Sequence, residues 1–281
     1  MKLLVNSIRV ALAFLGITVT RRKTFNELVS DRLKLERTKN FLIFQSALTL
    51  DAAKKSLQLF SESKSENFQD IFVLLILCEK EEGFFVEFGA TDGISGSNTH
   101  LLEKKFNWRG GLAEPARCWH ASLKRSRSAE ISHKLVWKKC GDTLRFRETV
   151  DAGFSTIETL VASDKHSARR DAANVYNVQT ISLNQLLLDF KAPDLLDYMS
   201  IDTEGSELDI LESFDFKRHR PLILTVEHNY RPDRSRLVEL MTLQGYVRAP
   251  ISVSKYDDWF VCHTLAERLD SIFVKESHQD F

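Results

Sequence analysis

Segments typical of strands and of helices alternate along most of the chain after Gly83. Strands are predicted at residues 84–88, 109–115, 133–140, 195–202, 221–228, 245–250 and 258–263, and helices at 97–106, 116–127, 207–214 and 235–244. A helix between two strands implies a crossover connection, which joins parallel strands. We therefore expect an α/β fold, with a mostly parallel sheet and helices on both faces.

The residues before Gly83 have a different pattern. Residues 24–80 contain helix formers in apolar clusters and predict helices. We therefore divide the chain into an N-terminal helical segment, residues 1–80, and an α/β domain, residues 81–281. Within that domain, residues 149–174 are rich in Ser, Ala and charge, and we expect them to form a partly helical lid insertion.

An apolar stretch near the N-terminus, residues 8–19, is the one segment for which we consider membrane contact. It is about half as long as the roughly 20 residues that a spanning helix needs. Arg21, Arg22 and Lys23 follow it. A core helix or a dimer-contact helix is the favoured interpretation, so a homo-oligomer is one expectation. The alternative is peripheral membrane contact through residues 8–23, with the basic cluster meeting anionic lipid.

The charge balance and the cysteines restrict the partners. Lys plus Arg and Asp plus Glu are both 39, so the formal net charge is zero and no nucleic-acid partner is expected. The basic run 124–128 is interpreted as a solvated helix end. The four cysteines are widely spaced and form no CxxC pair, which disfavours a zinc site or a disulfide framework and favours the cytoplasm.

Polar residues follow four of the predicted strands where each strand ends. In an open parallel sheet, ligands bind beyond the carboxyl ends of the strands, where the strand order reverses. We therefore expect the site to be formed by residues from these strand ends: Glu87 to Gly93, Glu114, Asp202, Glu204, Glu227, His228 and Asn229.

The turn after the first strand, EFGATDG, indicates which ligand binds. Gly89 allows a sharp exit from the strand, and Gly93 allows backbone to approach a ligand closely. Glu87 and Asp92 would repel a pyrophosphate, but they suit a ligand with an amine and a single carboxylate. S-adenosylmethionine has these groups, and Glu114 lies where it could bind both ribose hydroxyls.

Three blocks of the sequence, VEFGATDGISGSNTHLLEKKFNWRGGLAEP, DYMSIDTEGSELDILESFDF and TVEHNY, resemble the FkbM-type S-adenosylmethionine-dependent methyltransferases. The resemblance spans roughly residues 67 to 263 and implies a class I methyltransferase (Rossmann-like) fold. Thr91 departs from the common pattern, in which a glycine is frequent. The resemblance implies cofactor contacts at Glu87, Gly89, Ala90, Asp92, Gly93, Asn98, Glu114, Asp202 and Glu204. It also implies that Asp202, Glu204, Glu227 and His228 face the reaction centre.

The family typically methylates hydroxyl groups, so we expect O-methylation of a sugar, a glycan or a glycosylated natural product. The alternatives are a non-sugar or lipid-linked acceptor, or a catalytically silent binding module. Because a sugar hydroxyl must lose its proton, two devices remain open. His228 could act as a general base. Alternatively, Mg²⁺ held by Asp202 and by Glu227 or Asn229 could lower the pKa of the hydroxyl.

Overall fold

A computed structural model describes residues 22–149, 153, 155–160, 173–250, 252 and 254–274. The chain divides into two compact units, Met1–Leu42 and Ile43–Phe281. Residues 43–80, which the sequence assigned to a separate helical segment, therefore belong to the same unit as the α/β domain. The reason is burial: every residue of helix α4 (Gln69–Ile76) is buried in this unit.

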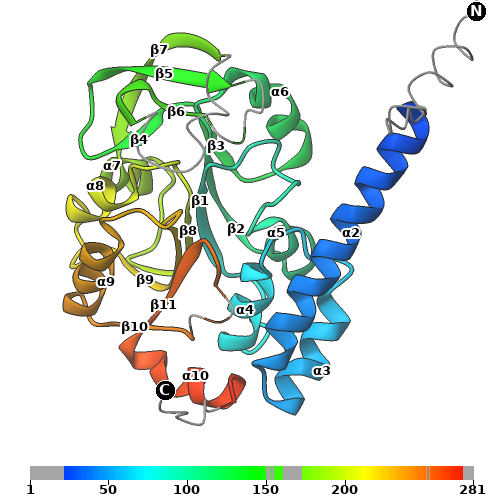
Figure 1. Cartoon of the computed structure of the whole chain (residues 1–281). Coiled ribbons are helices and arrows are strands. Elements are labelled where there is room, and N and C mark those ends of the chain that lie inside the picture. The colour runs from blue at the N-terminus through cyan, green and yellow to red at the C-terminus, as the bar shows by residue number, and fades with distance from the viewer. Residues whose placement is uncertain are drawn as a thin grey trace, which may run out of the picture. The chain divides into compact units, whose positions relative to one another are not determined.

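The larger unit is built on a seven-stranded sheet with the order β10-β11-β9-β8-β1-β2-β3 (Figure 1). Five neighbouring strands, from β3 to β9, run parallel, whereas β11 is antiparallel to β9 and β10 is antiparallel to β11. The bounds of the strands are β1 (Phe84–Phe88), β2 (Arg109–Ala113), β3 (Glu130–Ser132), β8 (Leu195–Ile201), β9 (Arg220–Glu227), β10 (Tyr246–Arg248) and β11 (Asp257–Cys262). The predicted mostly parallel sheet is confirmed.

Helices cover both faces of this sheet, as predicted (Figure 1). On one face lie α4, α5 and α6, and on the other lie α7, α8 and α9. Their bounds, with those of the remaining helices, are α2 (Arg22–Ser46), α3 (Leu50–Leu59), α5 (His100–Phe106), α6 (Arg117–Ser126), α7 (Leu183–Asp189), α8 (Glu207–Glu212), α9 (Arg234–Leu243), α10 (Ala266–Ile272) and the 3₁₀ turns η2 (Glu158–Leu160) and η5 (His263–Leu265).

The side chains of β1 explain why both faces need a cover. All five of its residues are buried, because successive side chains point to opposite faces of the sheet. Phe84, Val86 and Phe88 pack with α7, α8 and α9 in one core cluster. On the other face, the Arg127 guanidinium lies over the ring of Phe85, 5.4 Å from its centre. A strand that is buried on both faces is typical of the centre of a parallel sheet.

A second, smaller sheet has the order β4-β7-β5-β6. Its strands are β4 (Leu135–Trp137), β5 (Thr143–Thr149), β6 (Thr156–Ile157) and β7 (Ala173–Ser182). The strand predicted at residues 133–140 therefore forms, but it pairs with β7 rather than joining the main sheet, where β3 takes the edge position. In the predicted lid, residues 149–174, the described part holds the ends of β5 and β7, β6 and η2; the remainder lies outside the described residues.

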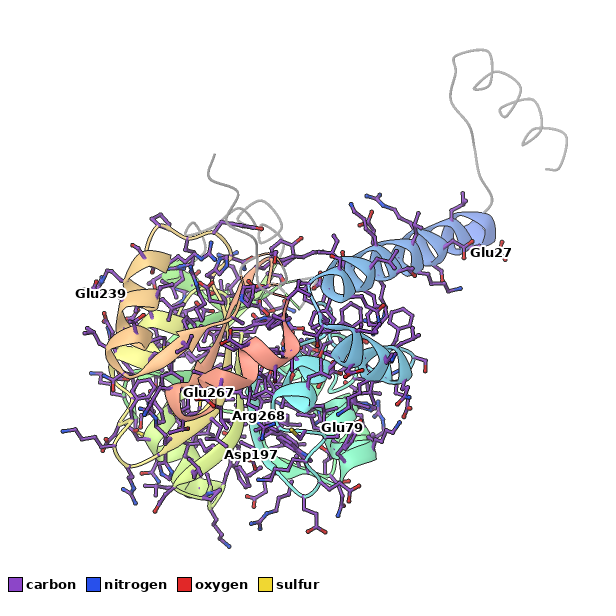
Figure 2. All side chains as sticks on the ribbon, turned by 90° about the horizontal axis from the view of Figure 1, so that it is seen from below. Glu27, Glu79, Asp197, Glu239, Glu267 and Arg268 are labelled. Carbon is purple, nitrogen blue, oxygen red and sulfur yellow. The ribbon has the colours of Figure 1, made fainter. Side chains whose placement is uncertain are left out.

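Asp197 fixes the amino ends of the central strands and is labelled in the view from below (Figure 2). Its carboxylate accepts a hydrogen bond from the backbone N–H of Phe84 at 2.9 Å and pairs with Lys80 at 2.6 Å. These contacts tie the start of β8 to the start of β1. The register of β1 and β8 is thereby fixed, and their carboxyl ends lie side by side.

Residues 8–23 were interpreted as a core or dimer-contact helix, with membrane contact as the alternative; of these, residues 8–21 lie outside the described residues. Within the part of the chain that is described, no helix has the length and apolar character needed to cross a bilayer.

Candidate active site

The order of the strands reverses between β1 and β8. From β1 the chain crosses to β2 on one side, whereas β8 and then β9 lie on the other side. The carboxyl ends of these four strands meet at one edge, where ligands of open α/β sheets bind. Residues from all four strand ends line two adjoining cavities at this edge.

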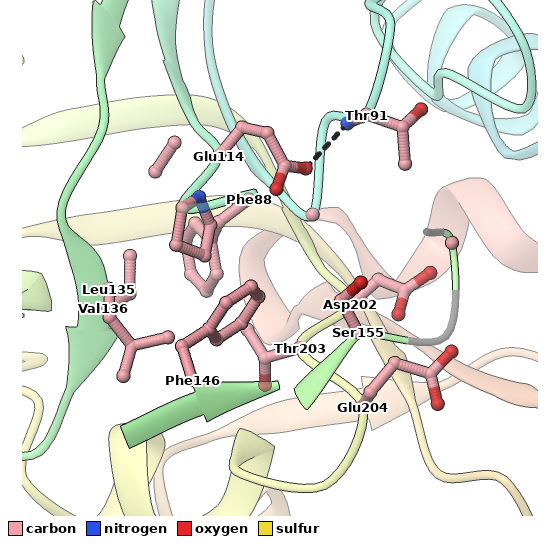
Figure 3. Close-up of a pocket in the computed structure, with 14 residues that line it drawn as sticks. Phe88, Thr91, Glu114, Leu135, Val136, Phe146, Ser155, Asp202, Thr203 and Glu204 are labelled. Atoms are coloured by element: carbon pink, nitrogen blue, oxygen red, sulfur yellow. Dashed lines mark hydrogen bonds between the residues drawn. The ribbon is translucent and has the colours of Figure 1, made fainter. Parts of the chain in front are cut away.

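The first cavity is narrow and has an apolar and a polar end (Figure 3). Phe146, Leu135 and Val136 line the apolar end, while Asp202 and Glu204 lie at the other end. Glu114 faces it from the end of β2. A flat aromatic group would suit the apolar end and a charged group the other.

The second cavity has a volume of about 300 Å³ and shares Gly89, Thr91, Asp202 and Glu204 with the first. Ala90 and Asn98 line it, as do Glu227 and Asp257. The side-chain amide of Asn98 donates to Ser200 Oγ at 3.0 Å, while its Oδ1 is buried without a partner among the described residues. The floor of this cavity therefore has a hydrogen-bond acceptor that a bound ligand could satisfy.

Gly89 is required by a close approach between two strand ends. Its φ is +80°, and a Cβ placed on it would lie 2.0 Å from the backbone oxygen of Asp202. Both facts exclude any residue with a side chain unless the backbone moves. The turn after β1 and the turn after β8 are thus packed directly against each other.

Glu87, Asp92 and Gly93, predicted to contact the cofactor, support the turn from within. The Glu87 carboxylate accepts hydrogen bonds from Ser97 Oγ at 2.9 Å and from the N–H of Asn98 at 2.7 Å. Asp92 accepts from the N–H groups of Ile94 and Ser95, at 2.8 and 2.7 Å. A Cβ on Gly93 would collide with side chains of α6 rather than with a ligand.

Arg127 holds the same turn from the end of α6, and its side chain is fully buried. It pairs with Glu103 at 2.7 Å, lies 3.6 Å from Glu87, and donates to Thr99 Oγ1 at 2.8 Å. The prediction of a solvated helix end at residues 124–128 is therefore wrong for Arg127. Two buried carboxylates need a buried cation, which sequence spacing does not reveal.

Glu114 lies where the sequence predicts it, at the end of β2 and against the narrow cavity. Its two oxygens accept from the N–H groups of Thr91 and Ala116, each at 2.8 Å. Thr91 takes a left-handed conformation, with φ of +47°, although it is not a glycine. Burial raises the pKa of Glu114 to about 7 despite these bonds. Each oxygen keeps a lone pair for a further donor.

Three carboxylates converge where the two cavities meet. Asp202, Glu204 and Glu227 each offer an oxygen, and these oxygens lie within 4.8 Å of one another. Asp202 borders the cavities. Desolvation by the surrounding protein, and then repulsion by the Asp257 carboxylate, raises the pKa of Asp202 to about 8. Burial, and then Asp202, raises the pKa of Glu227 well above its usual value. Oxygen-rich clusters of this kind suit a hard divalent cation.

Glu207 was not singled out in the sequence, yet it shapes the turn that carries Asp202 and Glu204. One of its oxygens accepts from Thr203 N, Thr203 Oγ1 and Gly205 N, each at 3.0 Å. It begins α8, where a carboxylate is favoured by the free N–H groups of the helix start. That position within IDTEGSE was the signal that could have identified it.

His228 contacts a neighbour outside the carboxylate cluster, whereas Asn229 contacts one of the cluster's members. The His228 ring is 2% exposed, packs edge-on against Tyr230 and accepts from the Tyr230 N–H at 3.0 Å. Burial lowers its pKa. The amide of Asn229 donates to Glu204 at 3.4 Å. Glu227 lines the larger cavity, whereas His228 lines neither of the two cavities.

The raised pKa of Asp202 predicts how stability depends on pH. An aspartate whose pKa rises from 3.8 in the unfolded chain to about 8 in the folded protein stabilises the fold at low pH, and this stability is lost as pH rises between those values. Asp202→Asn should remove this pH-dependent part of the free energy of unfolding. Because Asp202 is exposed to cavity water, we expect that part to be about 1 kcal/mol. Urea unfolding at both ends of this range measures it; an equal decline in the variant would contradict the prediction.

The strand order, the acidic glycine turn at the switch point and the acid at the end of β2 define a class I methyltransferase. The family model described as Methyltransferase FkbM domain matches residues 87–256, more than half of the chain. The chain belongs to the FkbM methyltransferase domain family, so the prediction from the sequence blocks is confirmed. Methyltransferases of this fold in general use S-adenosylmethionine as the methyl donor.

Two solved structures are distantly similar. One is precorrin-6Y C5,15-methyltransferase from Geobacter metallireducens GS-15, at 10% identity over 68% of this chain and 85% of that chain, with a TM-score of 0.35. The other is a putative RNA methyltransferase from Pyrococcus horikoshii, at 11% identity over 69% and 80% of the two chains, with a TM-score of 0.33. Because both TM-scores are below 0.5, we infer nothing about this protein from either similarity. Comparison with curated proteins gives no match.

Proposed function

We propose that this methyltransferase transfers the methyl group of S-adenosylmethionine to a hydroxyl of a sugar, a glycan or a glycosylated natural product, in the cytoplasm. The observation that carries the proposal is the carboxylate cluster at the junction of the two cavities. It lies where the donor's methyl group and the acceptor's hydroxyl would meet. A hydroxyl needs help in losing its proton, and a cluster of carboxylates is suited to provide it.

The narrow cavity fits the adenosine half of the donor. Phe146, Leu135 and Val136 would contact the adenine, and the free lone pairs of Glu114 would accept from the ribose hydroxyls. The methionyl end would then extend over Gly89 and Ala90 into the larger cavity. Asn98 Oδ1, which has no partner among the described residues, would accept from the donor's ammonium group.

The protein's main task is alignment. The methyl group on a sulfonium is already activated, so the acceptor oxygen, methyl carbon and sulfur need only be held in line. Asp202 lies between the two cavities and would fix the donor on one side and the acceptor on the other. His228 is less suited to the role of base, because its ring is buried and lines neither cavity.

The carboxylate cluster also fits a divalent cation. Three oxygens within 4.8 Å of one another, two of them on groups with raised pKa values, repel each other until a positive charge offsets them. Asp202, Glu204 and Glu227 would hold Mg²⁺, with Asn229 supporting Glu204 in place of acting as a ligand. Bound Mg²⁺ would lower the pKa of the acceptor hydroxyl.

Removal of divalent cations should abolish turnover. Exhaustive chelation is expected to stop methyl transfer, and added Mg²⁺ to restore it. Glu204→Gln should weaken binding of Mn²⁺, measured by electron paramagnetic resonance, by about tenfold or more, as loss of a charged ligand does. Glu239→Gln, on the exposed side of α9, is the control and should bind Mn²⁺ normally. Full activity after chelation would remove the cation from the mechanism.

Mass spectrometry tests the acceptor class. Glycans and metabolites from cells with and without the gene are compared for a missing methyl group. Loss of an O-methyl group from a carbohydrate supports the proposal. A methyl group missing only from protein, lipid or nucleic acid would contradict it.

A further inference from the structure

The larger cavity is lined by several carboxylates and, among the described residues, by no cationic side chain. Among the described residues that line it are five carboxylates and no lysine, arginine or histidine: Glu66, Asp202, Glu204, Glu227 and Asp257. No ion pair within the described part of the chain involves Glu66, Asp202, Glu227 or Asp257. Only three of the five belong to the cluster at the junction of the cavities. Glu66 and Asp257 form a second acidic group, nearer the α3–α4 loop.

Glu66 and Asp257 lie on a wall of the cavity that is held in place by hydrogen bonds of the α3–α4 loop. Asp70 is fully buried and accepts hydrogen bonds from Ser63 Oγ at 2.8 Å and from the N–H of Lys64 at 3.3 Å, which fixes the start of the α3–α4 loop. Ser65 then forms a bridge to Gly96, in the turn after β1. The loop that presents Glu66 and Asn67 is therefore held against the cofactor turn.

One uncharged acceptor of the wall, Asn67 Oδ1, has no donor among the described residues. Gln69 accepts from the N–H of Asn67 at 3.1 Å and donates to Asp257, so its amide is fully oriented. Asn67 is only 5% exposed, lines the cavity, and its Oδ1 has no partner within the described residues. A buried carbonyl oxygen without a donor is costly. A ligand that brings N–H groups would satisfy it.

The charges already assigned do not account for Glu66 and Asp257. The methyl donor carries one net positive charge, from its sulfonium, ammonium and carboxylate groups. That charge, together with a divalent cation held by Asp202, Glu204 and Glu227, would offset the charge of this cluster. The two remaining carboxylates face a volume that only the acceptor can fill. An acidic acceptor would be repelled there, and a neutral one would leave both charges unpaired.

We propose that the acceptor carries an ammonium group close to the hydroxyl that is methylated, as an amino sugar does, and that Glu66, Asn67 and Asp257 bind this group. The inference rests on the proposed function, because it assigns the acceptor to the same cavity. It makes the α3–α4 loop the element that determines acceptor specificity. The hydroxyl would then point toward Asp202 and Glu227 at the junction of the cavities.

Three matched sugars test the proposal by calorimetry at neutral pH: D-glucosamine, D-glucose and D-glucuronate. Each is titrated into the full chain saturated with S-adenosylhomocysteine and Mg²⁺. Glucosamine should bind more tightly than glucose by about two- to fivefold or more, the range of one partly exposed ion pair, and glucuronate should bind most weakly. Equal affinities, a preference for glucuronate, or binding of none of the three would overturn the proposal.

Variants that each remove one carboxylate test whether Glu66 and Asp257 cause the preference for glucosamine. Glu66→Gln should reduce the preference for glucosamine over glucose, and Asp257→Asn should do the same. Glu239→Gln removes an exposed charge from α9, far from this wall, and should leave the preference intact (Figure 2). Failure of S-adenosylhomocysteine itself to bind would instead sink the proposed function, and the sugar comparison on the donor-free protein would still decide the acceptor's charge.

Discussion

Gly89→Ala should lower the affinity for S-adenosylhomocysteine by about a hundredfold or more, because a 1 Å displacement in a site can cost that much. The added Cβ would lie 2.0 Å from the Asp202 backbone oxygen, so the turns after β1 and β8 must separate. Both turns line the two cavities. Calorimetric titration of the variant measures the loss.

The chain provides a matched control for this substitution. Gly141 has φ of +83°, and a Cβ on it would meet nothing within 4 Å. Gly141→Ala therefore carries the same left-handed strain, about 1 to 2 kcal/mol, without the collision. It should bind S-adenosylhomocysteine with unchanged affinity. If both variants lost affinity equally, or neither did, the close approach of the two turns would not be what organises the site.

Arg127→Met should destabilise the protein by about 3 to 5 kcal/mol, the usual effect of removing one partner from a buried ion pair. Methionine fills much of the volume, but the carboxylates of Glu87 and Glu103 would remain buried without their cation. The free energy of unfolding in urea measures the effect. Because Glu87 holds the turn at Ser97 and Asn98, cofactor affinity should also fall.

Arg125→Met is the comparison for this second variant. Arg125 lies on the same helix but is exposed, so its loss should change stability by less than about 0.5 kcal/mol. A small effect at both positions would contradict a structural role for Arg127. The hydrophobic stem of the side chain would then account for its burial.

The main sheet could be predicted because its strands are apolar and its helices are amphipathic. Both patterns are local, so LLDYMSID and SRLVELMTLQ identify β8 and α9 without knowledge of their neighbours. The small sheet was missed for the opposite reason. In TLRFRET, residues 143–149, Leu144 and Phe146 alternate with polar residues as a strand requires, but the charges obscured this pattern.

The site was predictable by position but not by direction. Strand ends identified Glu114, Asp202, Glu204 and Glu227, which do line the cavities. Sequence alone does not say which way a side chain points, so Glu87 and His228 were grouped with them although each is turned toward protein. The contribution of Glu66 and Asn67 comes from a loop outside the recognised blocks, and only folding brings it to Gly96.

We expect the turn from Glu87 to Gly93 and the strand ends beside it to bind the methyl donor. Calorimetric titration of the full chain with S-adenosylhomocysteine tests this most directly. One molecule should bind per chain, with micromolar or tighter affinity, and Glu114→Ala should weaken binding about tenfold or more through loss of the ribose contacts. A well-folded protein that binds no S-adenosylhomocysteine, or a Glu114→Ala variant that binds it unchanged, would contradict the claim.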